Sequence, residues 1–84
     1  MKARYARTLA AIFHRPVLGT IRWADIEALL TMLGAEKEER EGSRVAFLWK
    51  GQVFLFHRPH PNPEADKGAV ASLRRILEAN GIRP

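Results

Sequence analysis

Two histidines and an arginine stand together in one short basic segment, residues 57–61, which reads HRPHP. Histidine suits proton transfer because its unperturbed pKa lies near neutral pH. Arginine suits phosphate because its charge is permanent and its fork geometry is fixed. The two prolines stiffen the segment and exclude it from a helix interior or a central strand. We therefore expect His57 and His60 to be candidate acid–base residues; loop histidines without a catalytic role are the alternative.

The spacing of His57 and His60 would also suit two metal ligands. Structural zinc needs four ligands, however, and the chain contains no Cys to supply the others. The sequence also contains no convincing glycine-rich phosphate loop, Ser-His-Asp arrangement or pair of catalytic carboxylates. We expect neither a metal nor another cofactor.

A predicted β-hairpin leads into this segment. Two apolar runs, Val45–Trp49 and Val53–Phe56, are separated by Lys50-Gly51. Glycine readily adopts the positive φ that a two-residue hairpin turn requires. With these two residues as the turn, the register sets His57 across from Arg44. A histidine and an arginine on neighbouring strands would place a base beside a phosphate clamp.

Apolar residues fall on both faces of this hairpin, which is unusual for a small antiparallel sheet with one wet side. We expect the second and final helices to cover the aromatic face. The N-terminal helix, or a partner protein, could cover part of the opposite face. The aromatic face carries Val45, Phe47, Trp49, Gln52, Phe54 and Phe56, and the opposite face carries Arg44, Ala46, Leu48, Val53, Leu55 and His57.

Apolar spacing predicts two helices before the hairpin, over residues 3–14 and 23–33. A last helix begins after Asp66, a candidate N-cap, and stops at Gly81. The charged stretch 35–41 predicts an edge strand, since charge there blocks unwanted pairing. The predicted order is helix, helix, three strands, helix. In this arrangement Phe47, Phe54 and Phe56 would face Ile26, Leu30, Val70 and Leu73.

The whole chain has 84 residues, enough for one small domain with a thin core. Its net charge is +5, which favours a polyanionic partner such as nucleic acid. No apolar run approaches the ~20 residues that a membrane helix needs, so we expect no membrane association. We also reject a targeting signal at the N-terminus, where the apolar stretch is short. The absence of Cys suits a cytosolic protein.

Four sequence features resemble the HicA family of bacterial toxins, which belong to type II toxin–antitoxin pairs. The most specific is the opening of the last helix, with its Lys-Gly start and a serine before the apolar stripe. The resemblance covers residues 23–82. The features are Leu29-Leu30-x-x-Leu33-Gly34, Gly42-Ser43, Pro59-His60-Pro61 and Asp66-Lys67-Gly68-x-Val70-x-Ser72-Leu73-x-Arg75-Ile76-Leu77.

This resemblance implies an α+β fold of the order α-β-β-β-α, a three-stranded antiparallel sheet packed on helices, similar to double-stranded RNA-binding domains. It also implies ribosome-independent, metal-free cleavage of mRNA in the cytoplasm and neutralisation by a HicB-type antitoxin. Residues 20–84 would form the HicA-like domain, and residues 1–19 an extra N-terminal helix and linker. The family's catalytic histidine usually follows Gly-Ser, where this chain has Arg44.

Arg44, His57 and His60 are therefore the expected catalytic residues, with Arg44 acting on the phosphate. The expected RNA contacts are Ser43, Arg44, Arg58, Lys67, Arg74 and Arg75. Each of these cations could instead belong to a solvated charged face.

Three functions compete at this point. The leading one is a ribonuclease toxin that inhibits translation. The second is a non-catalytic RNA-binding module of the same fold, with its base lost at Arg44. The third is an interaction protein whose apolar sheet face docks an antitoxin or a second copy.

Overall fold

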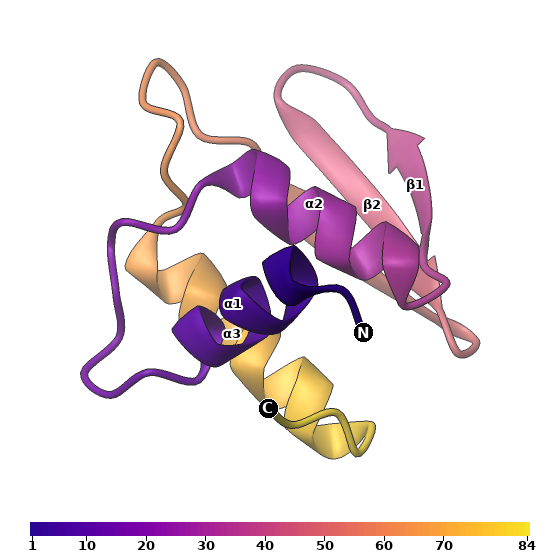
Figure 1. Ribbon diagram of the computed structural model, residues 1–84. Helices are drawn as coiled ribbons and strands as arrows, with labels where there is room; N and C mark the ends of the chain where they lie inside the picture. Colours follow the sequence, from indigo (N-terminus) through magenta and orange to yellow (C-terminus); the bar gives the residue numbers. More distant parts are fainter.

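The computed structural model describes all 84 residues and has three helices and one three-stranded antiparallel sheet (Figure 1). The order predicted from the sequence is confirmed. From α2 onward it is the α-β-β-β-α order of double-stranded RNA-binding domains. The elements are α1 (Ala3–Ile12), α2 (Trp23–Met32), β1 (Glu36–Glu39), β2 (Arg44–Trp49), β3 (Gln52–His57) and α3 (Lys67–Ala79).

The β2–β3 hairpin has the predicted turn and register. Lys50 and Gly51 both have positive φ, 51° and 76°, as a type I′ turn requires. The pairing runs from Trp49 opposite Gln52 down to Arg44 opposite His57. The tight turn therefore determines which residues meet at the far end of the hairpin.

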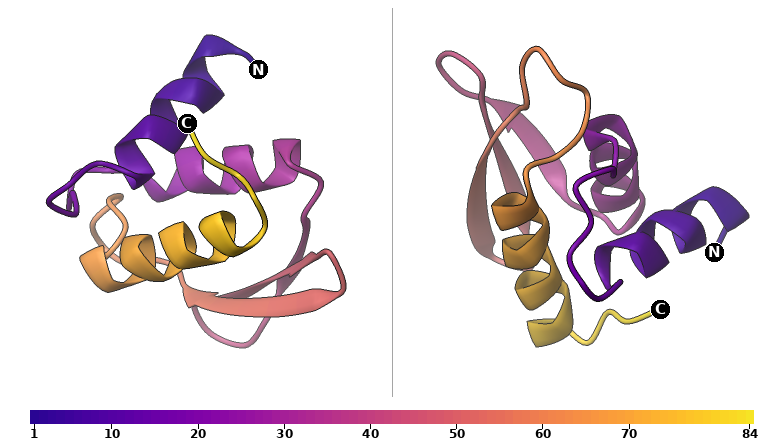
Figure 2. Two further views of the ribbon diagram at one scale, coloured as in Figure 1. Left: turned by 90° about the horizontal axis from the view of Figure 1, so that it is seen from below. Right: turned by 90° about the vertical axis from the view of Figure 1, so that its left-hand side faces the viewer.

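One face of the sheet is covered by α2 and α3 (Figure 2). At its centre Trp23, Phe47 and Phe56 form an aromatic cluster with ring centroids 5.7–6.4 Å apart. Tilted and edge-to-face contacts of this kind stabilise beyond the area they bury. The predicted packing of the aromatic face is confirmed. A single apolar cluster joins Phe47 and Phe56 to Ile26, Leu30, Val70 and Leu73, and Phe54 packs against it.

The N-terminal helix α1 packs on the far side of α2 and α3, away from the sheet (Figures 1 and 2). Its anchors Leu9 and Ile12 are buried in the same core. The expectation that this helix could cover the opposite sheet face is therefore wrong. Because α1 forms a third layer, Val53 and Leu55 stay 57% and 59% exposed. A partner protein remains the alternative cover.

The loop between β3 and α3, residues 58–66, is fixed to neighbouring elements at both of its ends. The Arg58 N–H donates to the Ser43 carbonyl at 2.8 Å. At the other end the Ala65 N–H donates to the Ile21 carbonyl at 2.7 Å, and Asp66 caps α3 by accepting from the Ala69 N–H at 3.2 Å. The predicted N-cap is confirmed, and the loop lies beside the start of α2.

The strand β1 forms one edge of the sheet, as the charged stretch predicted. All four of its residues are exposed. None of the helices has the length and apolar character needed to cross a membrane.

Candidate functional site

The hairpin end brings together two of the predicted catalytic residues. Arg44 and His57 are directly opposite each other on β2 and β3, and both are exposed on the open face of the sheet. Side chains at such a pair lie within contact distance because their Cβ atoms are about 4.5–5.5 Å apart. Arg44 has no carboxylate partner, and its Nε makes a long bond of 3.4 Å to the Glu41 carbonyl. Its guanidinium is therefore available to an anion.

Ser43 precedes this pair and extends the ladder by one step. Its carbonyl accepts from the Arg58 N–H, while its side chain is exposed. The backbone on both sides of His57 is consequently held.

Arg58 is held by carboxylates. Its Nε donates to Glu27 on α2 at 2.9 Å, and its Nη2 donates to Glu39 on β1 at 2.7 Å. Glu27 also accepts from the indole of Trp23 on the same helix at 2.6 Å and from Lys37 of β1 at 3.5 Å, so this carboxylate joins α2, β1 and the start of the loop. Arg58 ties the hairpin end to α2 and β1. Its predicted contact with RNA stays a prediction, and these ion pairs weigh against it.

These bonds change the ionisation of both partners. The hydrogen bond from Arg58, together with its charge, holds the pKa of the Glu39 carboxyl below its ordinary value. The bonds to Glu39 and Glu27 raise the pKa of Arg58, which stays fully charged. No pattern in the sequence predicts this cluster, because Glu27 is 31 residues and Glu39 19 residues from Arg58.

His60 lies apart from the Arg44–His57 pair. It lines an open hollow of about 420 Å³ together with Lys67 and Asp66. His57 lines a different hollow that runs between β3 and α3, and Asp66 borders both. The two histidines therefore lie on either side of the start of α3. As a pair of metal ligands they are not brought into one site.

Lys67 opens α3 with its stem packed against Gly19. A Cβ placed on Gly19 would lie only 3.2 Å from the Lys67 Cε, so a larger residue there would displace the lysine. This contact holds the lysine stem along the hollow that His60 lines.

The two arginines of α3 differ in their surroundings. Arg75 is exposed, donates to the Ser72 hydroxyl at 3.2 Å and lines the continuation of the β3–α3 groove. Arg74 is half-buried, and its Nε and Nη1 are enclosed without a hydrogen-bond partner. Arg75 can therefore meet a ligand lying in the groove, whereas Arg74 does not present those two donors at the surface.

The chain is thus a small basic α+β domain whose element order, from α2 onward, is that of double-stranded RNA-binding domains. The family model for the HicA toxin of bacterial toxin–antitoxin pairs matches residues 23–82, which is most of the chain. The protein therefore belongs to the HicA toxin family, and its partner is an antitoxin. No curated protein and no solved structure gives a match. The helix α1 lies outside the matched residues.

Proposed function

We propose that this protein is a metal-independent mRNA endoribonuclease that acts in the cytoplasm as the toxin of its pair. The proposal is carried by the Arg44–His57 pair, a free guanidinium directly opposite an imidazole on an exposed sheet face. The two side chains supply a phosphate clamp and a proton-transfer group at one place. Membership of the HicA family supports the toxin role.

The reaction requires two proton transfers and one charged clamp. A base takes the proton of a ribose 2′-hydroxyl, whose oxygen then forms a bond to the adjacent phosphorus. The bond from phosphorus to the 5′-oxygen breaks, and an acid protonates that oxygen, leaving a 2′,3′-cyclic phosphate and a 5′-hydroxyl. Arg44 would stabilise the charge that builds up on the phosphate, and His57 would transfer a proton beside it.

His60 and Lys67 would take part from the other side of Asp66. Their hollow borders the same residue as the hollow that His57 lines. RNA crossing the start of α3 would meet both histidines, which allows one to act as base and the other as acid. Lys67 would hold the neighbouring phosphate, and Arg75 one further along the β3–α3 groove.

A HicB-type antitoxin would block this surface. An acidic partner suits Arg44 and His57, and the exposed Val53 and Leu55 on the same face offer an apolar centre for the contact. Association should weaken as salt screens the charges. Binding that is unchanged from low to high salt, with Arg44 and His57 outside the contact, would contradict this mode of neutralisation.

The activity is tested by incubating the purified protein with mRNA in EDTA and analysing the ends of the products. We expect cleavage that yields 2′,3′-cyclic phosphates and that stops when the antitoxin is added. Binding of RNA without any cleavage would instead identify a non-catalytic RNA-binding module. Cleavage only after addition of a divalent metal would overturn the metal-independent mechanism.

A further inference from the structure

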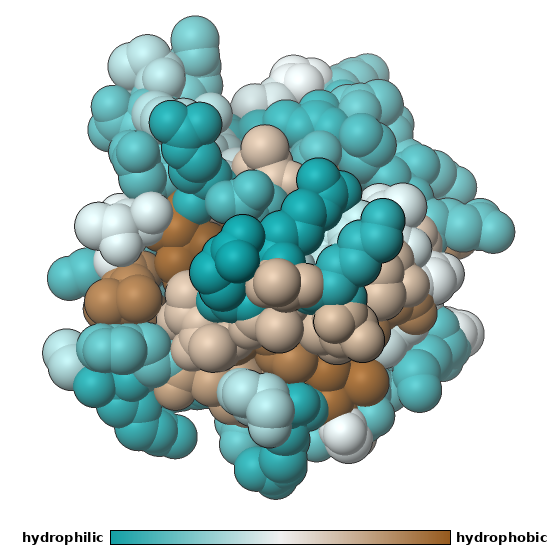
Figure 3. All heavy atoms as spheres, viewed as in Figure 1, coloured by the Kyte–Doolittle hydropathy of each residue, from teal (hydrophilic) through white to brown (hydrophobic).

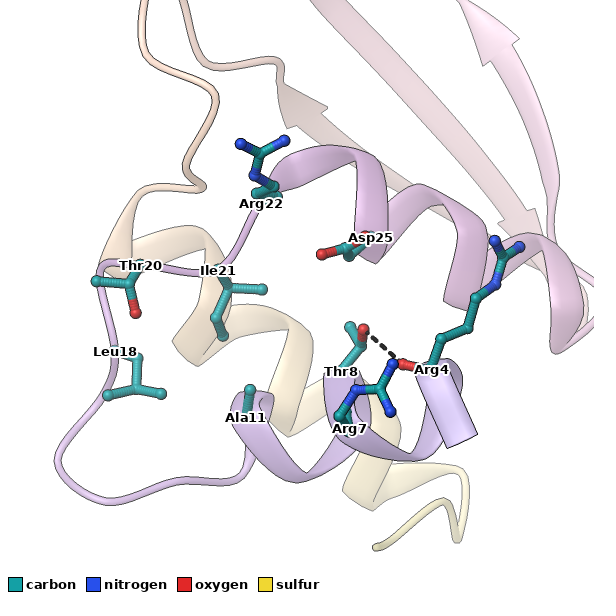
Figure 4. A pocket seen from close by; sticks show the side chains of 9 residues that line it. All are labelled: Arg4, Arg7, Thr8, Ala11, Leu18, Thr20, Ile21, Arg22 and Asp25. Atoms are coloured by element: carbon teal, nitrogen blue, oxygen red, sulfur yellow. Dashed lines mark hydrogen bonds between the residues drawn. The ribbon is translucent and has the colours of Figure 1, made fainter. Parts of the chain in front are cut away.

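A second basic hollow lies between α1 and the segment that leads into α2 (Figure 4). Its volume is about 350 Å³, and three arginines line it, against one carboxylate. Figure 4 shows Arg22 and Arg4 toward its two ends, with Arg7 and Asp25 between them. The remaining lining residues are Thr8, Ala11, Leu18, Thr20 and Ile21.

The three arginines are free of carboxylate partners. None of Arg4, Arg7 and Arg22 takes part in an ion pair, and Asp25 accepts no hydrogen bond from them. Arg4 donates to the Tyr5 hydroxyl at 2.7 Å and lies over that ring, which orients it and leaves other donors unused. The hollow therefore has a net positive charge, in contrast to the neutralised guanidinium of Arg58.

Rigid elements carry these side chains. The helix α1 is anchored by Leu9 and Ile12, which are 3% and 0% exposed. Arg22 sits where its backbone pairs with Glu64 of the loop. Figure 3 shows hydrophilic side chains gathered over α1 in the middle of this face. Because α1 is already held in one position, it would lose little conformational entropy when a ligand binds to it, and this favours binding.

This hollow also adjoins the one that His60 and Lys67 line. Gly19 borders the His60 hollow, and its neighbours Leu18 and Thr20 border the arginine hollow. One extended stretch of chain thus separates the two. An RNA chain that crosses the candidate catalytic site could continue over Gly19 and reach the three arginines.

We propose that the arginine hollow binds the sugar–phosphate backbone of the RNA on one side of the cleaved bond. Arg7 and Arg22 contact phosphates through their fork geometry, and Asp25 accepts from the amino group of an unstacked base. This inference rests on the proposed RNA cleavage and extends it to α1, which lies outside the family match. The N-terminal helix therefore enlarges the RNA surface of the matched domain.

The test compares two double variants of the full chain that lose the same charge. Arg7→Ala with Arg22→Ala removes two of the three arginines that line the hollow. Arg15→Ala with Arg83→Ala removes two exposed arginines elsewhere. The probe is single-stranded 2′-O-methyl RNA, which cannot be cleaved because the attacking hydroxyl is blocked. Binding is measured by fluorescence anisotropy over a range of salt concentrations, after circular dichroism and melting curves establish that the variants are folded.

We expect the Arg7/Arg22 variant to bind an RNA of ~16 nucleotides roughly tenfold more weakly than the wild type does. The slope of its log binding constant against log salt concentration should be smaller in magnitude by about 1.4, because two phosphate contacts are lost. The Arg15/Arg83 control should bind nearly as the wild type does. An RNA of ~4 nucleotides, too short to reach both hollows, should bind the two variants equally. Equal losses in both variants on the long RNA, with wild-type cleavage intact, would overturn this inference alone. A wild type that neither binds nor cleaves RNA would overturn the proposed function with it.

Discussion

The two histidine-bearing regions of this protein are held in place in different ways. His57 ends β3 opposite Arg44, and the next residue's N–H bonds to Ser43, so ladder bonds flank it on both sides. His60 lies in a stretch, residues 59–62, that makes no backbone hydrogen bond. Its order comes from the flanking prolines and from the anchored loop ends.

This difference suggests a division of labour in the proposed reaction. Groups mounted on paired strands are held more closely to one geometry than groups on loops. The Arg44–His57 pair is therefore the better preorganised part of the site. In the proposed reaction His60, which lies on a loop, would be held less closely to one geometry than His57.

Replacing the two histidines separately gives the largest expected effects and tests the division directly. His57→Ala should lower RNA cleavage by ~10²–10⁴-fold, the usual effect of losing a positioned acid–base group. His60→Ala should lower it less, because the loop residue is less constrained. The measurement is the rate of RNA cleavage in EDTA, with growth inhibition in bacteria as a second readout.

His14→Ala is the matched control, since this exposed histidine at the end of α1 lies outside both hollows. It should cleave as fast as the wild type. A double variant of His57 and His60 that still cuts at the wild-type rate would show that the acid–base assignment is wrong. A greater loss in His60→Ala than in His57→Ala would reverse the comparison between strand and loop.

Replacing the cations of the two regions comes next in size. Arg44→Ala should weaken binding of uncleavable RNA by roughly 1.5–3 kcal/mol, the value of a charge-assisted hydrogen bond. Lys67→Ala should cost less, because an ammonium on a flexible stem contacts phosphate as a point charge. Anisotropy titrations at fixed salt measure both. Equal losses of RNA affinity in Arg44→Ala and Lys67→Ala would mean that the paired strands hold their cation no more effectively than the loop side does.

The connection between the two regions is tested by Arg58. Arg58→Ala leaves Glu27, whose side chain is 18% exposed, without the closer of its two cationic partners. We expect a loss of unfolding free energy of about 1–3 kcal/mol, measured by urea denaturation. Arg40→Ala, which breaks a more exposed pair with Glu38, should cost at most ~1 kcal/mol. A loss in Arg58→Ala no larger than that of Arg40→Ala would contradict the anchoring role.

The strand region was predictable from the sequence in a way the rest of the site was not. The Lys50-Gly51 turn and the alternation of apolar residues together determined the register, and with it the meeting of Arg44 and His57. Local signals sufficed because the turn residues and the strands they pair are neighbours in the chain.

The placement of α1 and of Arg58 required information that the sequence patterns do not contain. Apolar periodicity predicted that one face of α1 is buried, but not which surface covers it. Arg58 looked like any basic surface residue because its carboxylate partners are distant in the chain. The arginine hollow could not be predicted from the sequence either, because it forms only when α1 packs on α2.

The smallest expected effect concerns pH and the Arg58–Glu39 ion pair. The pKa of Glu39 is held below its ordinary 4.5 in the folded protein, chiefly by the hydrogen bond from Arg58. Ionised Glu39 therefore stabilises the fold fully above its unfolded pKa, and this contribution is lost as pH falls through the lower folded value. Because the carboxylate is exposed, the contribution is slight.

Glu39→Gln isolates this contribution from the other carboxylates. The wild type should be slightly more stable than the variant at neutral pH, and the gap should close as the pH is lowered past 4.5. Paired urea titrations across that range measure the difference. The Glu39→Gln variant leaves the second carboxylate that Arg58 contacts, Glu27, in place. A gap that widens on acidification would mean that Glu39 is not held ionised by Arg58, and that α2 alone anchors the start of the His60 loop.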